Sequence, residues 1–140
     1  MEIKELSIGI WVRCKGATSR VREIESDWIT LETARGLDCV TSTLIDPIEL
    51  TTDLLKKLSF KVEHVRGASS YEGYTTWVAY DSGFCFAITH GLSNTPGRDW
   101  TMHIDNADRQ TIANCDMAYL HQAQQLARLV GYQGDLFDRL

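Results

Sequence analysis

Cys85, His103 and Asp105 are three side chains whose types could do chemistry together. His103 and Asp105 lie two positions apart, so in a β-strand both point to the same side of a sheet. Cys85 joins them if the preceding strand pairs in the simplest register. Such a set could hold a metal ion or activate the thiol. Because the spacing matches no established pattern, we predict no metal site, and small-molecule capture or turnover at this face is only an alternative.

Signatures of enzymes are absent from the rest of the sequence. It contains no GxSxG nucleophile elbow, no phosphate-binding GxxxxGK, no dinucleotide-binding GxGxxG and no zinc-binding HExxH. We therefore expect a non-catalytic protein that uses no cofactor.

Three antiparallel strands, at residues 74–80, 84–90 and 100–105, would position these side chains. The segments are rich in aromatic and β-branched residues, and the turn cluster Asp81-Ser82-Gly83 separates the first two. Apolar residues alternate along the strands, which fixes the register wherever one face is buried. The simplest register predicts a core face of Val78, Tyr80, Phe84, Phe86, Ile88, Trp100, Met102 and Ile104.

The opposite face of this sheet is the first candidate binding surface. It would present Trp77 and His103 among small side chains. An N-terminal barrel could cover this face, or it could be an open platform for a ligand or partner, because aromatic side chains are enriched at recognition surfaces. In the simplest register the face consists of Trp77, Ala79, Cys85, Ala87, Thr89, Thr101, His103 and Asp105.

The predicted fold class is α+β, in one compact unit. Residues 1–50 contain short apolar segments separated by turn signals, a pattern typical of a small all-β barrel. The opening Leu6-Ser7-Ile8-Gly9, followed by Trp11-Val12, resembles the first strand of an SH3-like barrel. A helix over residues 51–60, capped by Thr51 or Thr52, should link this barrel to an antiparallel sheet and a C-terminal helix in residues 61–140.

Four basic residues beside Trp11 form a second candidate surface, for nucleic acid. No acidic residue interrupts the series Arg13, Lys15, Arg20 and Arg22, and such strand surfaces can contact phosphates. The whole chain carries 14 basic and 19 acidic residues, a net charge of −5. Because phosphate binding depends on positive charge, nucleic acid is the less favoured partner.

The longest predicted helix covers residues 117–130, with Asp116 as its N-cap and Gly131 after its last turn. Its apolar stripe should cover one face of the second sheet. The tail beyond the helix carries Leu136 and Phe137, which either pack back on the body or dock elsewhere. The polar stripe of the helix, which could recognise a partner or simply face water, consists of His121, Gln124, Gln125 and Arg128.

The composition is that of a soluble globular protein, with 44% hydrophobic and 24% charged residues. No apolar segment approaches the roughly 20 residues that cross a bilayer, and the start of the chain lacks a signal-peptide pattern. We therefore expect a cytoplasmic protein that does not engage a membrane. Because no CxxC pair occurs, buried thiols and no disulfides are expected for Cys14, Cys39, Cys85 and Cys115.

The chain resembles a family of short uncharacterised proteins carried by phages and prophages of Bacteroidetes-type bacteria. Ile10 and Ser59 depart from the family pattern, which has asparagine and glycine there. The family has no established activity, so the resemblance implies no catalytic residue. It implies expression inside a bacterial host and binding of a host or phage protein, with inhibition of a host defence as one possible role. The resemblance rests on Glu5-Leu6-Ser7-Ile8-Gly9 with Val12, on Pro47-Ile48-Glu49-Leu50-Thr51 with Leu54, Leu55 and Phe60, and on Tyr119-Leu120-His121-Gln122 with Gln124 and Leu126.

Overall fold

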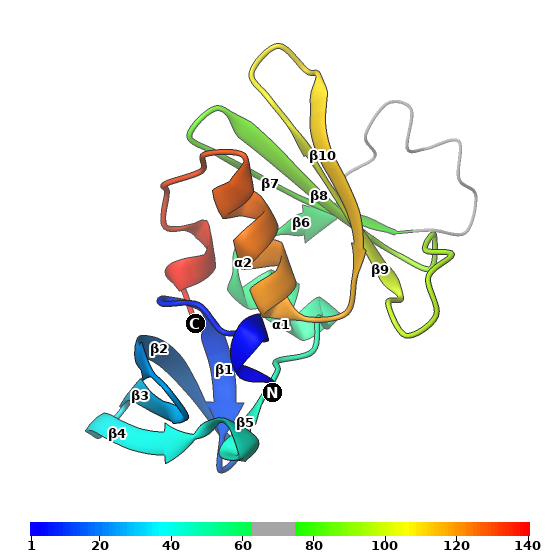
Figure 1. Ribbon diagram of the computed structural model, residues 1–140. Helices are drawn as coiled ribbons and strands as arrows, with labels where there is room; N and C mark the ends of the chain where they lie inside the picture. Colours follow the sequence, from blue (N-terminus) through cyan, green and yellow to red (C-terminus); the bar gives the residue numbers. More distant parts are fainter. Residues whose placement is uncertain (63–74) are drawn as a thin grey trace. The chain divides into compact units, whose positions relative to one another are not determined.

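The computed structural model describes residues 1–62 and 75–140. Its fold is α+β, as predicted, with two five-stranded antiparallel sheets and few helices (Figure 1). The chain forms two compact units. One consists of Met1–Glu49 with Tyr119–His121, and the other of Leu50–Ala118 with Gln122–Leu140.

The first sheet has the strand order β4-β3-β2-β1-β5. Within the part of the chain that the structure describes, β4 and β5 are its edges, so the sheet is open and does not close into a barrel. Short 3-10 turns at Ile3–Glu5 and Ser42–Leu44 accompany it. Its strands are β1 (Trp11–Cys14), β2 (Ala17–Glu25), β3 (Trp28–Thr33), β4 (Gly36–Thr41) and β5 (Ile45–Asp46).

One face of the first sheet holds the core of its unit. Val12, Ile29 and Leu31 are fully buried, because inward and outward side chains alternate along each strand. Gly9, with φ of 88°, turns the chain just before β1, so the first strand begins later than the opening segment suggests. The core cluster consists of Leu6, Ile10, Val12, Cys14, Val21, Ile29, Leu31, Val40 and Ile45.

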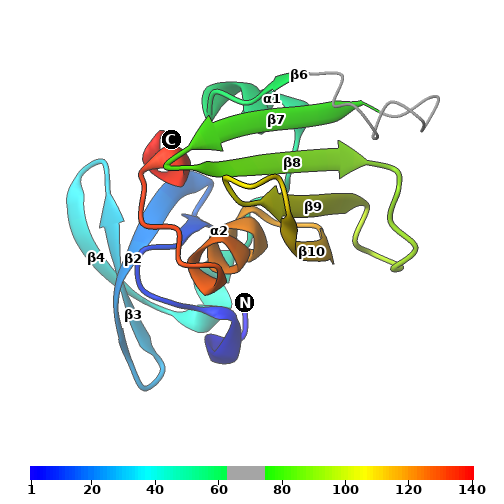
Figure 2. The ribbon, with the colours of Figure 1, turned by 90° about the horizontal axis from the view of Figure 1, so that it is seen from above.

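The second sheet has the order β10-β9-β8-β7-β6 (Figure 2). It contains the short strand β6 in addition to those expected, and β10 is longer than the fourth strand suggested by the sequence. Tyr71 and Tyr74, the second of which begins a predicted strand, lie outside the described residues. The strands are β6 (Lys61–Val62), β7 (Thr76–Asp81), β8 (Phe84–His90), β9 (Trp100–Asp105) and β10 (Thr111–Met117).

The β7–β8 hairpin has a turn of two residues. Ser82 and Gly83 have φ of 52° and 81°, and Asp81 pairs directly with Phe84. Two successive positive φ values are the signature of the tight hairpin turn whose twist matches that of the strands. The sequence-based register assumed a three-residue turn, and a one-residue slip exchanges the two faces of a strand.

The prediction for β7 was therefore wrong, whereas the pairing of β8 with β9 is confirmed. Trp77 lies opposite Ile88 on the core face and is only 8% exposed, with the Lys56 ammonium 6.0 Å from its ring centroid. Val78 and Tyr80 lie on the other face. The residues predicted to share the core face of the next hairpin do so, and Phe86 pairs with Ile104 and Ile88 with Met102.

Helix α1 spans Thr52–Lys57 and agrees with its predicted signals. The hydroxyl of Thr51 accepts a hydrogen bond from the Leu54 N–H at 3.1 Å, as an N-cap does. Leu55 and Leu58 on its apolar stripe are fully buried.

Helix α2 spans Leu120–Leu129, so it begins later than predicted. β10 runs through Asp116 and Met117, and the Asp116 carboxylate accepts hydrogen bonds from the hydroxyls of Thr95 and Thr101, at 2.7 and 2.9 Å. These bonds hold Asp116 in the sheet, where it cannot cap a helix. The Gln122 side chain instead accepts a bond from the Ala118 N–H at 2.8 Å.

The C-terminal segment packs back on the second unit. Tyr132 and Phe137 are buried, and their rings lie 4.9 and 5.8 Å from that of Phe86. A 3-10 turn at Leu136–Asp138 carries Phe137 into this cluster. Of the two alternatives for the tail, packing on the body is the one observed.

The cysteines form no disulfide, but they are not uniformly buried. Cys14 is buried, Cys85 and Cys115 are half-buried, and Cys39 on the edge strand β4 is exposed, which corrects the prediction of buried thiols. Among the described helices, none combines the length and the apolar character needed to cross a membrane.

Candidate functional site

The outer face of β1–β4 in the first sheet, which we call the Trp28 face, is its most open surface. Every side chain on it is exposed or half-buried, in contrast to the core face. The register places one row of side chains across the four strands and a second row four residues away along β3. The rows are Trp11, Arg20, Glu32 and Leu37, and then Glu25, Trp28 and Thr41, with Glu23, Thr30 and Cys39 between them.

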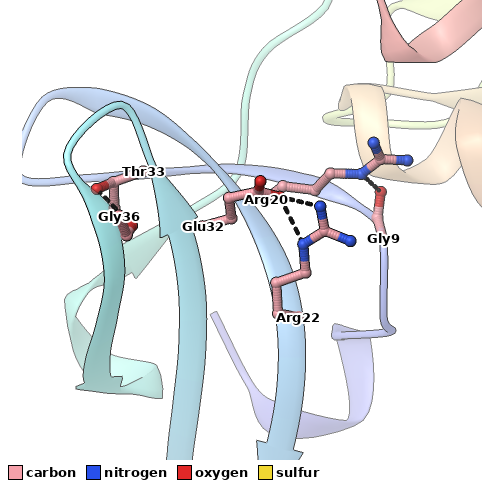
Figure 3. A network of polar contacts seen from close by, with 6 residues as sticks. All are labelled: Gly9, Arg20, Arg22, Glu32, Thr33 and Gly36. Atoms are coloured by element: carbon pink, nitrogen blue, oxygen red, sulfur yellow. Dashed lines mark hydrogen bonds and ion pairs between the residues drawn. The ribbon is translucent and has the colours of Figure 1, made fainter.

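One half of the Trp28 face combines aromatic and basic side chains. The Arg20 guanidinium lies 5.4 Å from the ring centroid of Trp11, directly across the β1–β2 ladder. Its Nε donates a hydrogen bond to the Gly9 carbonyl at 3.1 Å (Figure 3). Arg20 is thus fixed by two contacts within its own unit.

Arg22 is also engaged within this unit. Its guanidinium forms a hydrogen bond and an ion pair with the Glu32 carboxylate (Figure 3). Arg13 and Lys15 remain exposed, and Arg13 lies directly across from Asp46. The four basic residues therefore do share one region, but the structure interleaves them with carboxylates, which lowers the positive potential that phosphate binding requires.

The other half of the Trp28 face is aromatic and acidic. Trp28 is 56% exposed and pairs directly with Glu25 across the β2–β3 ladder. Glu23 lies on the same face, and Asp27 adjoins Trp28 in the turn before β3. In the described part of the chain, none of these three carboxylates forms an ion pair or hydrogen bond. An exposed indole is therefore bordered by unneutralised negative charge.

Strand β4 completes this surface as an edge. Leu37 is 72% exposed, and Gly36, Asp38 and Cys39 are exposed as well. β4 pairs with β3, and no other strand among residues 1–62 and 75–140 pairs with it. An edge with exposed apolar side chains and unpaired backbone groups is a template for another chain.

Cys85, His103 and Asp105 do lie on one face of the second sheet. Cys85 is directly opposite Asp105, and His103 is opposite Ala87, two pairs further along. All three side chains are half-buried, and Asp105 accepts a hydrogen bond from the Thr111 hydroxyl at 2.7 Å. Trp77, which was predicted beside them, is on the other face. No cluster of three metal-ligating side chains is found in the described residues.

The predicted polar stripe of the last helix is not a surface. His121 and Gln124 are each only 4% exposed, Gln125 is half-buried and Arg128 is exposed. Gln124 lies four residues after Leu120, so helical periodicity places it in the buried stripe. The recognition hypothesis for this stripe depended on its facing solvent, and two of its four members do not.

His121 is a buried side chain. Its ring stacks on that of Tyr119, with centroids 5.7 Å apart and an interplanar angle of 12°. Its Nδ1 is buried without a hydrogen-bond partner among the described residues. Burial lowers the pKa of His121, and the Glu5 carboxylate partly opposes that shift. The imidazole is therefore held in its neutral form.

Sequence-based reasoning missed Trp28 and Leu37 as surface residues. The signal was present, because Trp28 alternates with the buried residues Ile29 and Leu31, so its parity on β3 directs it outward. The edge position of Leu37 could not be predicted, because it depends on which strand ends the sheet.

Comparisons with known proteins identify no relative, since no family model, no curated protein and no solved structure matches this chain.

Proposed function

We propose that this protein is a non-catalytic binding module that engages a partner protein through the Trp28 face and the adjoining β4 edge. The observation that carries the proposal is the exposure of Trp28 and Leu37, at 56% and 72%, on an open sheet face. Large apolar side chains exposed together on one face are characteristic of interaction sites, and tryptophan is the residue most enriched in binding hot spots.

The biological setting in this proposal is a phage or prophage accessory protein that binds a host or phage protein in the cytoplasm. The resemblance described above supports it, and inhibition of a host defence is one form that such binding can take. The proposal also includes an SH3-like arrangement of the first sheet and a C-terminal helix covering the second. Five short antiparallel strands, with β5 returning beside β1, support the former. The buried Ala123 and Ala127 of α2 support the latter.

The first test is affinity capture from host lysate with the wild-type protein and two variants. Trp28→Ala removes the exposed indole, whereas Ile112→Ala removes an apolar side chain that is 41% exposed in the second unit. We expect one dominant protein to be captured by the wild type and by Ile112→Ala after nuclease treatment, and to be lost with Trp28→Ala. Equal capture by all three would overturn the role of the Trp28 face.

Nucleic acid is the second candidate partner, favoured by the Trp11–Arg20 stack beside the exposed Arg13 and Lys15. Stacking platforms with flanking cations bind single strands. In this case the captured material would disappear with nuclease, and its binding would fall steeply between low and physiological salt. Arg13→Glu would abolish such binding and would leave capture of a protein partner intact.

A further inference from the structure

We infer that the partner contributes an extended, lysine- or arginine-bearing segment, which adds to the β4 edge as a sixth strand and places a cationic side chain on Trp28. This inference rests on the proposed binding function and names the chemistry of the partner. Backbone geometry, side-chain size and charge at the edge each support it.

The geometry of β4 leaves a row of its backbone N–H and C=O groups available to pair with another strand. Residues 34 and 35 form a two-residue turn, so Thr33 pairs with Gly36. Residues flanking such a turn form a hydrogen-bonded pair, and the pattern then alternates. Asp38 and Val40 thus bond to β3, whereas the N–H and C=O groups of Leu37, Cys39 and Thr41 point to the open edge. Strand addition uses a backbone row of this kind.

The side chains next to the edge leave a path to the indole. Neighbouring strands lie about 4.8 Å apart, so an added strand would be about two such spacings from β3. Only Cys39 and Thr41, both small, stand between the added strand and the β3 residues Thr30 and Trp28. A lysine or arginine side chain is long enough to cross them, whereas a short side chain is not.

The negative charge around Trp28 favours a cationic side chain of the partner over an apolar one of the same length. Glu23, Glu25 and Asp27 border Trp28 without forming ion pairs in the described part of the chain. A cation over an indole face gains from the ring quadrupole, and the carboxylates add to that attraction. Asp38 adds a negative charge to the edge strand, on the face opposite to that of Trp28.

The same charges argue against a second copy of this chain as the occupant. A two-fold pairing of β4 with itself would bring together two copies of a strand whose one charged residue is Asp38, and would double the negative charge of the adjoining faces that carry Glu23 and Glu25. Like charges placed directly opposite each other destabilise a sheet. The carboxylates around Trp28, together with Asp38, are complementary to a basic segment and not to a second copy of themselves.

The test begins with a displayed library of random short peptides, selected on the full chain and counter-selected on Trp28→Ala. We expect enrichment of peptides with lysine or arginine alternating with β-branched residues. Their affinity should fall about tenfold or more with Trp28→Ala and with Glu25→Lys, and should be unchanged by the matched charge reversal Asp108→Lys in the second unit. Enrichment of acidic or purely apolar peptides, or no Trp28-dependent enrichment, would overturn the inference.

Strand addition is tested separately with the best selected peptide. It is synthesised with N-methyl groups on alternate backbone nitrogens, in the two possible phases, and with lysine replaced by the shorter diaminopropionic acid. N-methylation in the phase that removes the N–H groups facing β4 should abolish binding, and so should the shorter cationic side chain. N-methylation in the other phase should leave binding intact. Cys39→Pro, which removes an edge N–H, should weaken binding, while Cys39→Ala should not; far-UV circular dichroism verifies folding.

The outcomes separate this inference from the proposed function. Equal binding of both N-methylated phases would exclude strand addition but leave a binding module that uses the Trp28 face. A dimer in sedimentation velocity that Cys39→Pro dissolves would assign the edge to a second copy and overturn the inference. Loss of both peptide selection and Trp28-dependent protein capture would remove the proposed function as well.

Discussion

The hydroxyl of Tyr132 donates a hydrogen bond to the carboxylate of Asp81, 51 positions earlier in the chain. The same hydroxyl accepts a hydrogen bond from the Leu136 N–H at 2.8 Å. Burial, and then the bond to Asp81, raise the pKa of Tyr132 above its ordinary value, so the hydroxyl remains a donor at neutral pH. It connects the end of β7 to the C-terminal segment.

Replacing Tyr132 with Phe should lower the free energy of unfolding by about 1–3 kcal/mol, because the Leu136 N–H and the Asp81 carboxylate lose their partner. Urea denaturation measures the loss. A double-mutant cycle with Asp81→Ala is the control, since removing both partners of a bond should cost less than the sum of the single changes. Strict additivity of the two effects would contradict a stabilising bond.

Gly134 should not tolerate a side chain. A Cβ there would overlap the Asp81 carboxylate and the Tyr132 hydroxyl, and would lie 2.6 Å from the Tyr132 ring. That ring is packed against Phe86 and Phe137, so it cannot easily move aside. Gly134→Ala should cost about 1–3 kcal/mol, measured by thermal unfolding. The adjacent exposed Gln133→Ala should have little effect, and equal shifts from both changes would count against this packing.

His121 should make the protein less stable in mild acid. Its pKa is lowered in the folded state by burial, so the unfolded chain binds the proton more readily. The stability associated with its neutral form is complete above the ordinary histidine pKa, about 6.5, and is lost as pH falls below that value.

A His121→Phe variant keeps a ring against Tyr119 and should show a flatter dependence of the unfolding midpoint between neutral pH and about pH 5. The hydroxyl bonds from Thr95 and Thr101 lower the pKa of Asp116, so its contribution is lost only at lower pH and does not confuse the comparison. Identical slopes for wild type and variant would show that His121 does not control the acid response.

Removing each of two buried hydroxyls, those of Ser19 and Thr89, should change the stability of the protein in different directions. Ser19 is 1% exposed and its Oγ has no hydrogen-bond partner among the described residues. The Thr89 hydroxyl, equally buried, lies 3.0 Å from that of Thr76. Ser19→Ala should leave stability unchanged or raise it by up to about 1 kcal/mol, whereas Thr89→Val should lower it by about 1–3 kcal/mol, because Thr76 is left unpaired. Chemical denaturation of both variants tests whether the effect of removing a buried hydroxyl on stability depends on its having a hydrogen-bond partner.

Local signals predicted some elements well. A cap at Thr51 or Thr52 before a leucine stripe predicted the start of α1, and the apolar alternation of Phe86 and Ile88 predicted the core face that β8 shares with β9. These features depend on neighbours in the sequence or on one strand pair. The faces of β7 depended on whether the turn contained two residues or three, and composition alone does not decide that.

The candidate site was harder to predict, because it depends on tertiary structure. The polar character of His121 and Gln124 suggested a solvent-facing stripe, although both are only 4% exposed and the spacing of Gln124 from Leu120 agrees with a buried position. Trp28 had the parity of an outward residue, but its importance depends on β4 being an edge. The polar pattern of the last helix thus predicted a surface that the fold largely buries. Trp28, an apolar residue, lies instead on the face that the fold leaves exposed.

The register shift between Val21 and Glu23 has a consequence for the length of β2. Two residues, Arg22 and Glu23, occupy the space opposite Thr30, as in a β-bulge, and the buried Val21 and the partly buried Ile24 face inward on either side. Arg22 is thus a one-residue insertion in an otherwise regular strand. Its deletion would restore strict alternation without moving a core side chain to the surface, so β2 is a place where this chain can change length and keep its fold.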